Sequence, residues 1–369
     1  MADITKTGIL NSLKKVEDPN FNKDLLILNS IKKFEVNDST LNLDLSFTLP
    51  SSNDSAQLKD KFIYKIKEDF PSLKIINLTI DAKTTVHQDL NKNQILPGVK
   101  NTIAVASGKG GVGKSTVAVN LAVVLAKEGA EVGLIDADIY GPSIPLMLGL
   151  KEKPKIMQNQ HTMKIIPLSN YGVKVISIGL LVDDNAPVIW RGPMASGAVK
   201  QFISDVDWGE LDYLFFDLPP GTGDIQLTLV QTIPLTAAVI VTTPQEVSLI
   251  DARKALKMFT RVNVPVAGVI ENMSYFTAPD TGKKYDIFGT GGGSKIADEL
   301  SVPFLGGIPI DPRIRIGGDN GVPVLYDTPD SEHAKAISQI SKNMASQIHL
   351  INVKGSAASK MEILLDADE

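Results

Sequence analysis

A glycine-rich stretch with two lysines is the part of the chain best suited to bind phosphate. It contains Gly108, Gly113, Lys114 and Ser115 in the spacing G-x-x-x-x-G-K-[ST], in which glycines let successive backbone N–H groups face phosphate oxygens. Lys114 supplies a positive charge to the outer phosphates, and Ser115 offers a hydroxyl to Mg²⁺. The residues expected to contact nucleotide here are Gly108, Lys109, Gly110, Gly111, Val112, Gly113, Lys114, Ser115 and Thr116.

Carboxylates follow two of the apolar runs further along the chain. Asp136 and Asp138 come at the end of one run, and Asp217 ends another that reads LFFD. A carboxylate at such a strand end can orient an attacking water or hold the water shell of magnesium, and Asp217 is expected to approach Mg²⁺ directly or through water. The residues predicted here to carry the chemistry are Lys114, Asp138 and Asp217, with Ser115 and Asp217 as the magnesium residues.

A proline-rich turn follows Asp217. Pro219, Pro220 and Gly221 impose a rigid, non-helical turn. Because this turn lies near the expected γ-phosphate, it is a candidate switch segment.

These residues need a sheet whose strands end together. Apolar runs alternate with helical stretches from residue 101 onward, which is typical of a parallel sheet buried on both faces. The sequence predicts an α/β fold, a doubly wound and mostly parallel sheet, with ligands at the carboxyl ends of its strands. The expected strands are 103–106, 132–135, 173–178, 213–216, 237–241, 266–270 and 304–305.

A small α+β domain is expected before this sheet, at residues 1–85. Its predicted elements are a helix at 4–16, strands at 31–36 and 40–48, a helix at 57–69 and a strand at 75–80. The remaining boundaries are a linker at 86–100, the nucleotide-binding domain at 101–350, whose last helix is expected at 331–350, and an acidic tail at 351–369.

Composition narrows the function. The 369 residues carry a net charge of −5, which argues against a broad nucleic-acid surface. The chain has no cysteine, and its 4 histidines lack metal-ligand spacing. No apolar run is long enough to span a bilayer and the first residues are too polar for a signal peptide, so we expect a cytoplasmic protein that binds neither membranes nor nucleic acid.

Eight segments together resemble one family. They are GKGGVGKST, DADIYGPS, WRGPM, DLPPGTGD, TTPQEVSLID, GVIENMSYF, YDIFGTGGG and IPIDPRIR. In this combination, over residues 95–345, the chain resembles the Mrp/ApbC ATPases, which carry iron–sulfur clusters. Residues 1–85 resemble the MIP18-like domain that often precedes them.

The resemblance implies further roles. Lys109 gives the loop the deviant form of the MinD/ParA class, in which this lysine reaches the partner's nucleotide. The resemblance thus implies that Lys109 is a further catalytic residue and that the protein is a homodimer. Asn272 would contact adenine, and Ile308–Asp311 would lie near the base. Arg191 is left open between a contact to phosphate or a partner and a structural loop. Iron–sulfur donor or target proteins are the implied partners, and Mg-ATP the implied cofactor.

The chain departs from the family at its usual cluster ligands. Members that bind a cluster have Cys-x-x-Cys after the ENMSYF segment, where this chain has Ala278 and Thr281. Neither is a normal iron–sulfur ligand, and Asp280, Tyr285 and Asp286 offer only hard oxygens. Three hypotheses stay open: a cluster carrier, an ATP-switched scaffold without a cluster of its own, and a MinD/ParA-like positioning ATPase, against which charge and the acidic tail argue.

Overall fold

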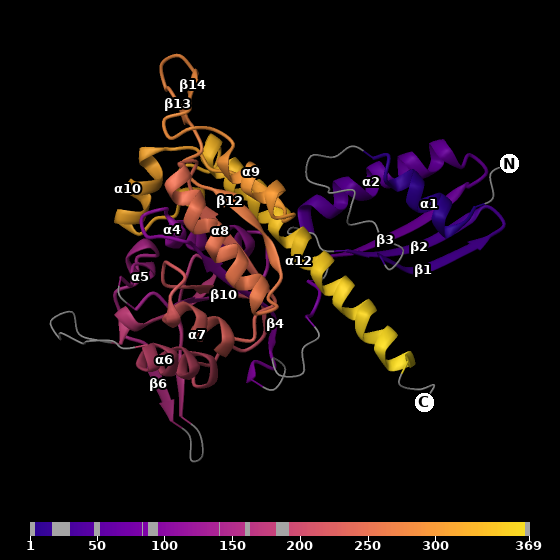
Figure 1. Cartoon of the computed structure of the whole chain (residues 1–369). Helices are drawn as coiled ribbons and strands as arrows, with labels where there is room; N and C mark the ends of the chain where they lie inside the picture. Colours follow the sequence, from indigo (N-terminus) through magenta and orange to yellow (C-terminus); the bar gives the residue numbers. More distant parts are fainter. Residues whose placement is uncertain are drawn as a thin grey trace. The chain divides into compact units, whose positions relative to one another are not determined.

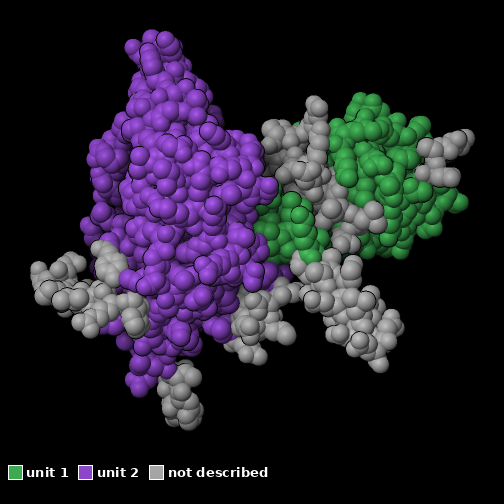
Figure 2. All heavy atoms as spheres, viewed as in Figure 1, with its two compact units in different colours: residues 1–85, 345–369 green, residues 86–344 purple. Residues whose placement is uncertain are grey.

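The computed structural model describes residues 4–16, 30–47, 52–82, 84–87, 95–139, 141–158, 163–181 and 192–365. The chain forms two compact units, which we call unit 1 (Met1–Thr85 with Ala345–Glu369) and unit 2 (Val86–Met344) (Figure 2). Each unit is described by itself. Arg191 lies outside the described residues.

Unit 1 contains a three-stranded sheet and two helices near the start of the chain. The sheet has the order β1-β2-β3, with β1 antiparallel and β3 parallel to β2. Leu41, Leu43 and Leu45 alternate with polar residues along β2 and are fully buried, as a half-buried strand requires. The elements are α1 (Lys6–Leu13), β1 (Ile31–Asn37), β2 (Thr40–Phe47), α2 (Ser52–Asp69) and β3 (Ile75–Ala82).

Unit 2 is organised around an eight-stranded sheet with the order β15-β12-β11-β4-β10-β5-β9-β8. Figure 1 labels three of its strands, β4, β10 and β12. Every neighbouring pair is parallel except β8 with β9. The strands are β4 (Val99–Ala106), β5 (Val132–Asp136), β8 (Leu168–Asn170), β9 (Val173–Ser177), β10 (Leu211–Asp217), β11 (Ala237–Thr242), β12 (Val266–Glu271) and β15 (Phe304–Gly307). The predicted doubly wound fold is confirmed, and all seven expected strands are present.

Helices cover both faces of this sheet. One face packs Ala104, Leu214 and Phe216 against residues of α6, α7, α8 and α9, while α4 packs on the opposite side of β4, β5 and β10. These helices are α4 (Lys114–Lys127), α6 (Gly192–Ser204), α7 (Asp224–Thr232), α8 (Glu246–Arg261) and α9 (Gly292–Glu299). The chain passes from β10 to β11 on the other side of β4, so the strand order reverses at β4. Sheets of this kind bind ligands at the carboxyl ends of the strands at such a switch point.

Smaller elements complete the chain. Two antiparallel hairpins, β6–β7 and β13–β14, were not expected from the sequence. The remaining elements are α5 (Ile144–Met147), β6 (Lys155–Gln158), β7 (Met163–Ile166), the 3-10 helix η3 (Ile178–Leu180), β13 (Phe276–Thr277), β14 (Lys284–Tyr285), α10 (Pro312–Asn320), α11 (Val324–Asp327) and α12 (Glu332–Leu365).

The chain departs from the expected boundaries at two places. Leu96 and Val99, inside the expected linker, are buried in the core of unit 2, because β4 starts at Val99 beside Leu211 of β10. Helix α12 runs on to Leu365 through the stretch expected to be a tail. From Ala345 onward it belongs to unit 1, where Asn352 Nδ2 donates to Thr85 Oγ1 at 2.9 Å.

Candidate nucleotide site

The glycine-rich loop joins β4 to α4 and owes its path to its glycines. Gly111 and Gly113 have φ values of 79° and 81°, which L side chains rarely adopt. At Gly108 the constraint is packing instead, because an added Cβ would lie 2.1 Å from the backbone carbon of Asp251 in α8. The loop therefore ends at the N-terminus of α4, whose positive dipole end favours anions.

Three predicted residues meet at the end of this loop. Lys114 Nζ lies 2.7 Å from Asp217 Oδ1 and 3.2 Å from Ser115 Oγ. Ser115 Oγ in turn donates to Asp217 Oδ2 at 2.5 Å. Burial raises the pKa of Asp217, and the ammonium of Lys114 opposes that rise. The structure thus brings the lysine of the loop and the carboxylate that ends β10 into one buried ion pair.

The two aspartates after β5 have different surroundings. Asp136 is fully buried and accepts hydrogen bonds from Ser177 Oγ at 2.9 Å and from the backbone N–H of Ile144 at 3.4 Å. Burial, reinforced by the charge of Asp217, raises the pKa of Asp136 to about 8. Asp138 instead lines the cavity at the loop, with its Oδ2 3.5 Å from Lys114 Nζ. Of the pair, only Asp138 lines this cavity.

Two adjoining cavities surround the loop. The first, which we call the loop cavity, has a volume of about 200 Å³ and is lined by residues that include Lys109, Lys114, Ser115 and Asp138. The second, the Asn272 cavity, has a volume of about 550 Å³. Gly113, Thr116 and Met147 line both, so the two adjoin. The larger volume is within the usual range of small-molecule sites.

The Asn272 cavity is lined by most of the residues expected near the base, and the buried Ile308 is the one that is not among its lining residues. Asn272, Pro309, Ile310 and Asp311 all line it. Asn272 also holds the loop, since its Nδ2 donates to the carbonyl of Val112 at 2.9 Å. The rest of the lining includes Ile314 and Arg315 of the IPIDPRIR segment, and also Leu146, Met147, Gly318 and Asp319, for which the sequence predicted no role.

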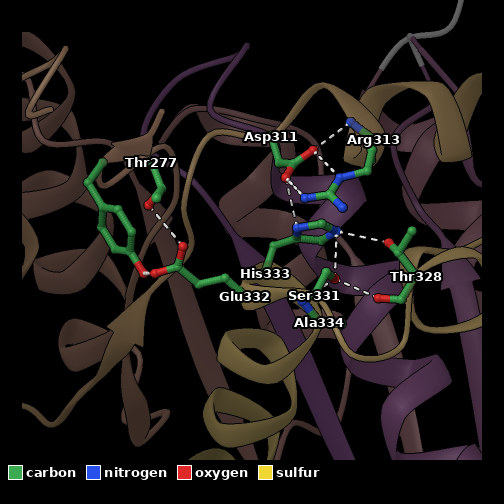
Figure 3. Close-up of polar contacts among 9 residues, drawn as sticks. Thr277, Asp311, Arg313, Thr328, Ser331, Glu332, His333 and Ala334 are labelled. Carbon is green, nitrogen blue, oxygen red and sulfur yellow. Dashed lines mark hydrogen bonds and ion pairs between the residues drawn. The ribbon is translucent and has the colours of Figure 1, made fainter. Parts of the chain in front are cut away.

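A buried histidine, His333, lies beside Asp311. Asp311 caps α10 and accepts hydrogen bonds from the backbone N–H of Arg313 at 2.8 Å and from its Nη2 at 2.6 Å (Figure 3). His333 Nδ1 lies 3.0 Å from Asp311 Oδ2 without the alignment of a hydrogen bond. The guanidinium of Arg313 lowers the pKa of Asp311, and burial lowers the pKa of His333. The sequence had assigned His333 no role beyond the lack of metal-ligand spacing among the histidines, and the structure shows that it is fully buried.

Glu332, the neighbour of His333, holds the β13–β14 hairpin. Its carboxylate accepts hydrogen bonds from Tyr275 Oη at 3.0 Å and Thr277 Oγ1 at 2.8 Å, and pairs with Lys284 Nζ at 2.9 Å. Figure 3 shows the bond from Thr277 beside the Asp311 cluster. Two consecutive residues at the start of α12 therefore support the wall of the Asn272 cavity and the base of this hairpin.

The hairpin carries the two residues at the expected cysteine positions. The backbone N–H of Ala278 donates to the carbonyl of Lys283 at 2.9 Å, and the Thr281 side chain is exposed on the connecting loop. Within the described part of the chain, no group of three or more His, Cys, Asp or Glu is placed to hold a metal ion. None of the helices described there is long and apolar enough to cross a membrane.

Comparison with known proteins identifies the family. The model of the NUBPL iron-transfer P-loop NTPases matches residues 98–345. The chain belongs to this family. A second model, described as an iron–sulfur cluster assembly protein, matches residues 6–77 of this P-loop NTPase.

Individual relatives agree with this family. An iron–sulfur cluster carrier protein of Synechocystis is 46% identical over 352 residues, 94% of this NTPase and 99% of the relative. The iron–sulfur cluster transfer protein NUBPL of Dictyostelium discoideum is 48% identical over 257 residues, covering 70% and 79% of the two chains. A nucleotide-binding protein of Archaeoglobus fulgidus, solved in complex with ADP, is 40% identical with a TM-score of 0.56, covering 63% of this chain and 91% of its own.

Proposed function

We propose that this chain binds ATP with Mg²⁺ and hydrolyses it in the transfer or assembly of iron–sulfur clusters. The observation that carries the proposal is the meeting of Lys114, Ser115 and Asp217 at a cavity that adjoins one large enough for a nucleoside. The names of the relatives support the iron–sulfur pathway.

Nucleotide binding would exchange the partners of Lys114. Its ammonium now neutralises Asp217, and the outer phosphates would take it over. Asp217 and the Ser115 hydroxyl would then be available as hard oxygen ligands, which are the donors that Mg²⁺ prefers. When bound, the ion neutralises charge on the phosphate oxygens. At Asp217 the ammonium of Lys114 would thereby be replaced by Mg²⁺.

Hydrolysis would depend on positioning rather than on a strong base. Asp138 lines the loop cavity and is the carboxylate placed to orient a water near the γ-phosphate. Asn272 would hold both the loop and the base, since it contacts Val112 and lines the larger cavity. Slow turnover is expected, because the site has no strong base and catalysis depends mainly on positioning and on the stabilisation of charge in the transition state.

Lys109 is proposed to act across a homodimer. It lines the loop cavity and is half-buried there. Replacement by alanine should spare nucleotide binding and weaken ATP-dependent self-association, which sedimentation with and without ATP measures. An undiminished dimer would exclude the role in trans.

Nucleotide binding itself is tested with Lys114→Ala and a fluorescent ATP analogue. The variant should lose binding, while Lys151→Ala, which alters an exposed lysine outside both cavities, should bind like the wild type. Circular dichroism checks that both variants are folded. Binding by folded Lys114→Ala at wild-type affinity would refute the assignment of the site.

The cluster is the cargo in this proposal, and the hairpin does not fit it. Ala278 has only a methyl group, and Thr281 offers an exposed hydroxyl in place of a thiolate. These two residues favour a second candidate within the same pathway, an ATP-switched scaffold that recruits cluster donors or targets without holding a cluster itself.

Anaerobic reconstitution separates the two candidates. The protein is incubated with iron and sulfide, desalted, and examined by absorption spectroscopy and iron analysis. A stable, stoichiometric cluster would favour the carrier and exclude the scaffold without a cluster. A spectrum without cluster bands, from protein that still binds ATP, would favour the scaffold.

A further inference from the structure

A third cavity lies next to the loop cavity, on the side of the proline-rich turn. Its volume is about 630 Å³, and its lining includes Pro219, Pro220, Gly223 and Gln226. We call Pro219–Gly223 the switch turn. Asp138 and Pro220 line both this cavity and the loop cavity, so the two adjoin at the place where the γ-phosphate is expected.

Gln226 is the unusual residue of this cavity. It is the third residue of α7, and only 2% of its surface is exposed. Neither Nε2 nor Oε1 of its amide has a hydrogen-bond partner within the described parts of the chain. Buried amides are nearly always hydrogen-bonded, because leaving one unpaired costs its full desolvation penalty. In this arrangement a methionine, which fills a similar volume, would be at least as favourable.

The switch turn has the freedom to become the missing partner. Within the described chain its backbone is held at two points: the N–H of Gly221 donates to the carbonyl of Ser107 at 2.9 Å, and the carbonyl of Gly223 accepts from the N–H of Leu227 at 3.1 Å. Gly221 has a φ of 102°, and no atom lies within 4 Å of a Cβ built on Gly221 or Gly223. No side chain caps α7 at Gly223. The turn therefore has unpaired backbone groups and open space beside it.

We propose that Gln226 is a positioning residue that holds the switch turn when nucleotide is bound. With Mg-ATP in the loop cavity, the turn shifts toward the adjoining cavity, and its backbone N–H and C=O groups pair with the Gln226 amide. The turn begins two residues after Asp217, so this pairing fixes the segment close to the magnesium carboxylate. The inference rests on the proposed nucleotide binding and adds to it the residue that holds the bound state.

The test compares Gln226→Met with Gln231→Met, which alters an exposed glutamine on the same helix. Without nucleotide, Gln226→Met should unfold at the same or a higher denaturant concentration than the wild type. Its kcat for ATP should fall roughly three- to tenfold, the equivalent of one or two hydrogen bonds, with KM within about twofold. Gln231→Met should match the wild type in each measurement.

Hydrogen exchange measures the protection of the backbone amides in the switch turn directly. A non-hydrolysable ATP analogue with Mg²⁺ should slow exchange at the amides of Gly221, Thr222 and Gly223 in the wild type and in Gln231→Met. In Gln226→Met these amides should exchange at least about threefold faster than in the nucleotide-bound wild type.

The outcomes separate this inference from the proposed function. A wild type that binds no ATP analogue would overturn both. Nucleotide binding with equal protection of the switch turn in wild type and Gln226→Met would overturn the role of Gln226 alone. A marked loss of stability in nucleotide-free Gln226→Met, with kcat unchanged, would show that the amide is a structural group and would also overturn it.

Discussion

The ion pair between Lys114 and Asp217 allows the most direct test of the site in the absence of ligand. We predict that Lys114→Met destabilises the nucleotide-free protein by about 3–5 kcal/mol, the usual cost of leaving one partner of a buried ion pair uncompensated. The pair is well buried, since the two side chains are 6% and 0% exposed and their atoms are 2.7 Å apart. No other ammonium in the described ion pairs faces Asp217.

A second variant, Asp217→Asn, allows a double-mutant cycle. Adding it to Lys114→Met removes the unpaired charge, so the double variant should recover at least about 2 kcal/mol of the loss. Because burial already raises the pKa of Asp217, the folded Lys114→Met protein should take up a proton that the unfolded chain lacks. Its deficit should therefore shrink as the pH is lowered from about 8 to about 5.

The assay is denaturant unfolding followed by tryptophan fluorescence. Of the 2 tryptophans of the chain, Trp208 is buried in the core of unit 2, so its fluorescence reports the unit that carries the pair. A matched control is Lys100→Met. Lys100 forms an ion pair of the same length, 2.7 Å, with Asp212, but the lysine side chain is 37% exposed. That exposed pair should contribute only up to about 1 kcal/mol. A cost of Lys114→Met no greater than that of the control, or a further loss of stability on adding Asp217→Asn, would refute this role of the ion pair.

Three further predictions concern other parts of unit 2. Gly108→Ala should lower stability by about 1–3 kcal/mol, because its Cβ would collide with the α8 backbone. Gly110→Ala, whose Cβ would meet only Pro220 Cγ at 3.9 Å, should stay within about 0.5 kcal/mol in the same unfolding assay. Burial lowers the pKa of His333, so below about pH 6.5 the unfolded chain is protonated at this residue while the folded protein stays neutral there. Lowering the pH should therefore reduce the stability of the wild type, and should reduce that of His333→Gln less, as tryptophan-detected unfolding at several pH values would show. Glu332→Gln should speed hydrogen exchange at the β13–β14 hairpin with a change in global stability below about 1 kcal/mol, and unchanged exchange would refute its role there.

The sheet and the loop were predictable because they depend on local patterns. Continuous apolar runs indicate strands buried on both faces, and Gly113 and Lys114 lie at fixed offsets along the chain. The Lys114–Asp217 contact joins residues about a hundred positions apart, yet it too follows from the rule that parallel strands end at one edge.

The rest depends on packing that leaves no local pattern. Asp136 and Asp138 look alike in the sequence, and only Ser177 on a neighbouring strand and the N–H of Ile144 identify Asp136 as the buried partner of other groups. Gln226 and His333 carry no motif either. Their importance comes from what surrounds them, an amide without partners and a ring beside Asp311.

The composition of unit 1 has a consequence for the order in which the protein folds during synthesis. This unit takes its residues from both ends of the chain, and its last described hydrogen bond joins Asn352 to Thr85. A ribosome makes all of unit 2 between those two segments. Domains usually fold as soon as they emerge, but unit 1 cannot be completed until the C-terminal helix is released. The described buried core of unit 1 comes from residues between Ile9 and Leu78. Nascent chains halted before residue 345 should therefore already contain this core but lack the hydrogen bond between Asn352 and Thr85.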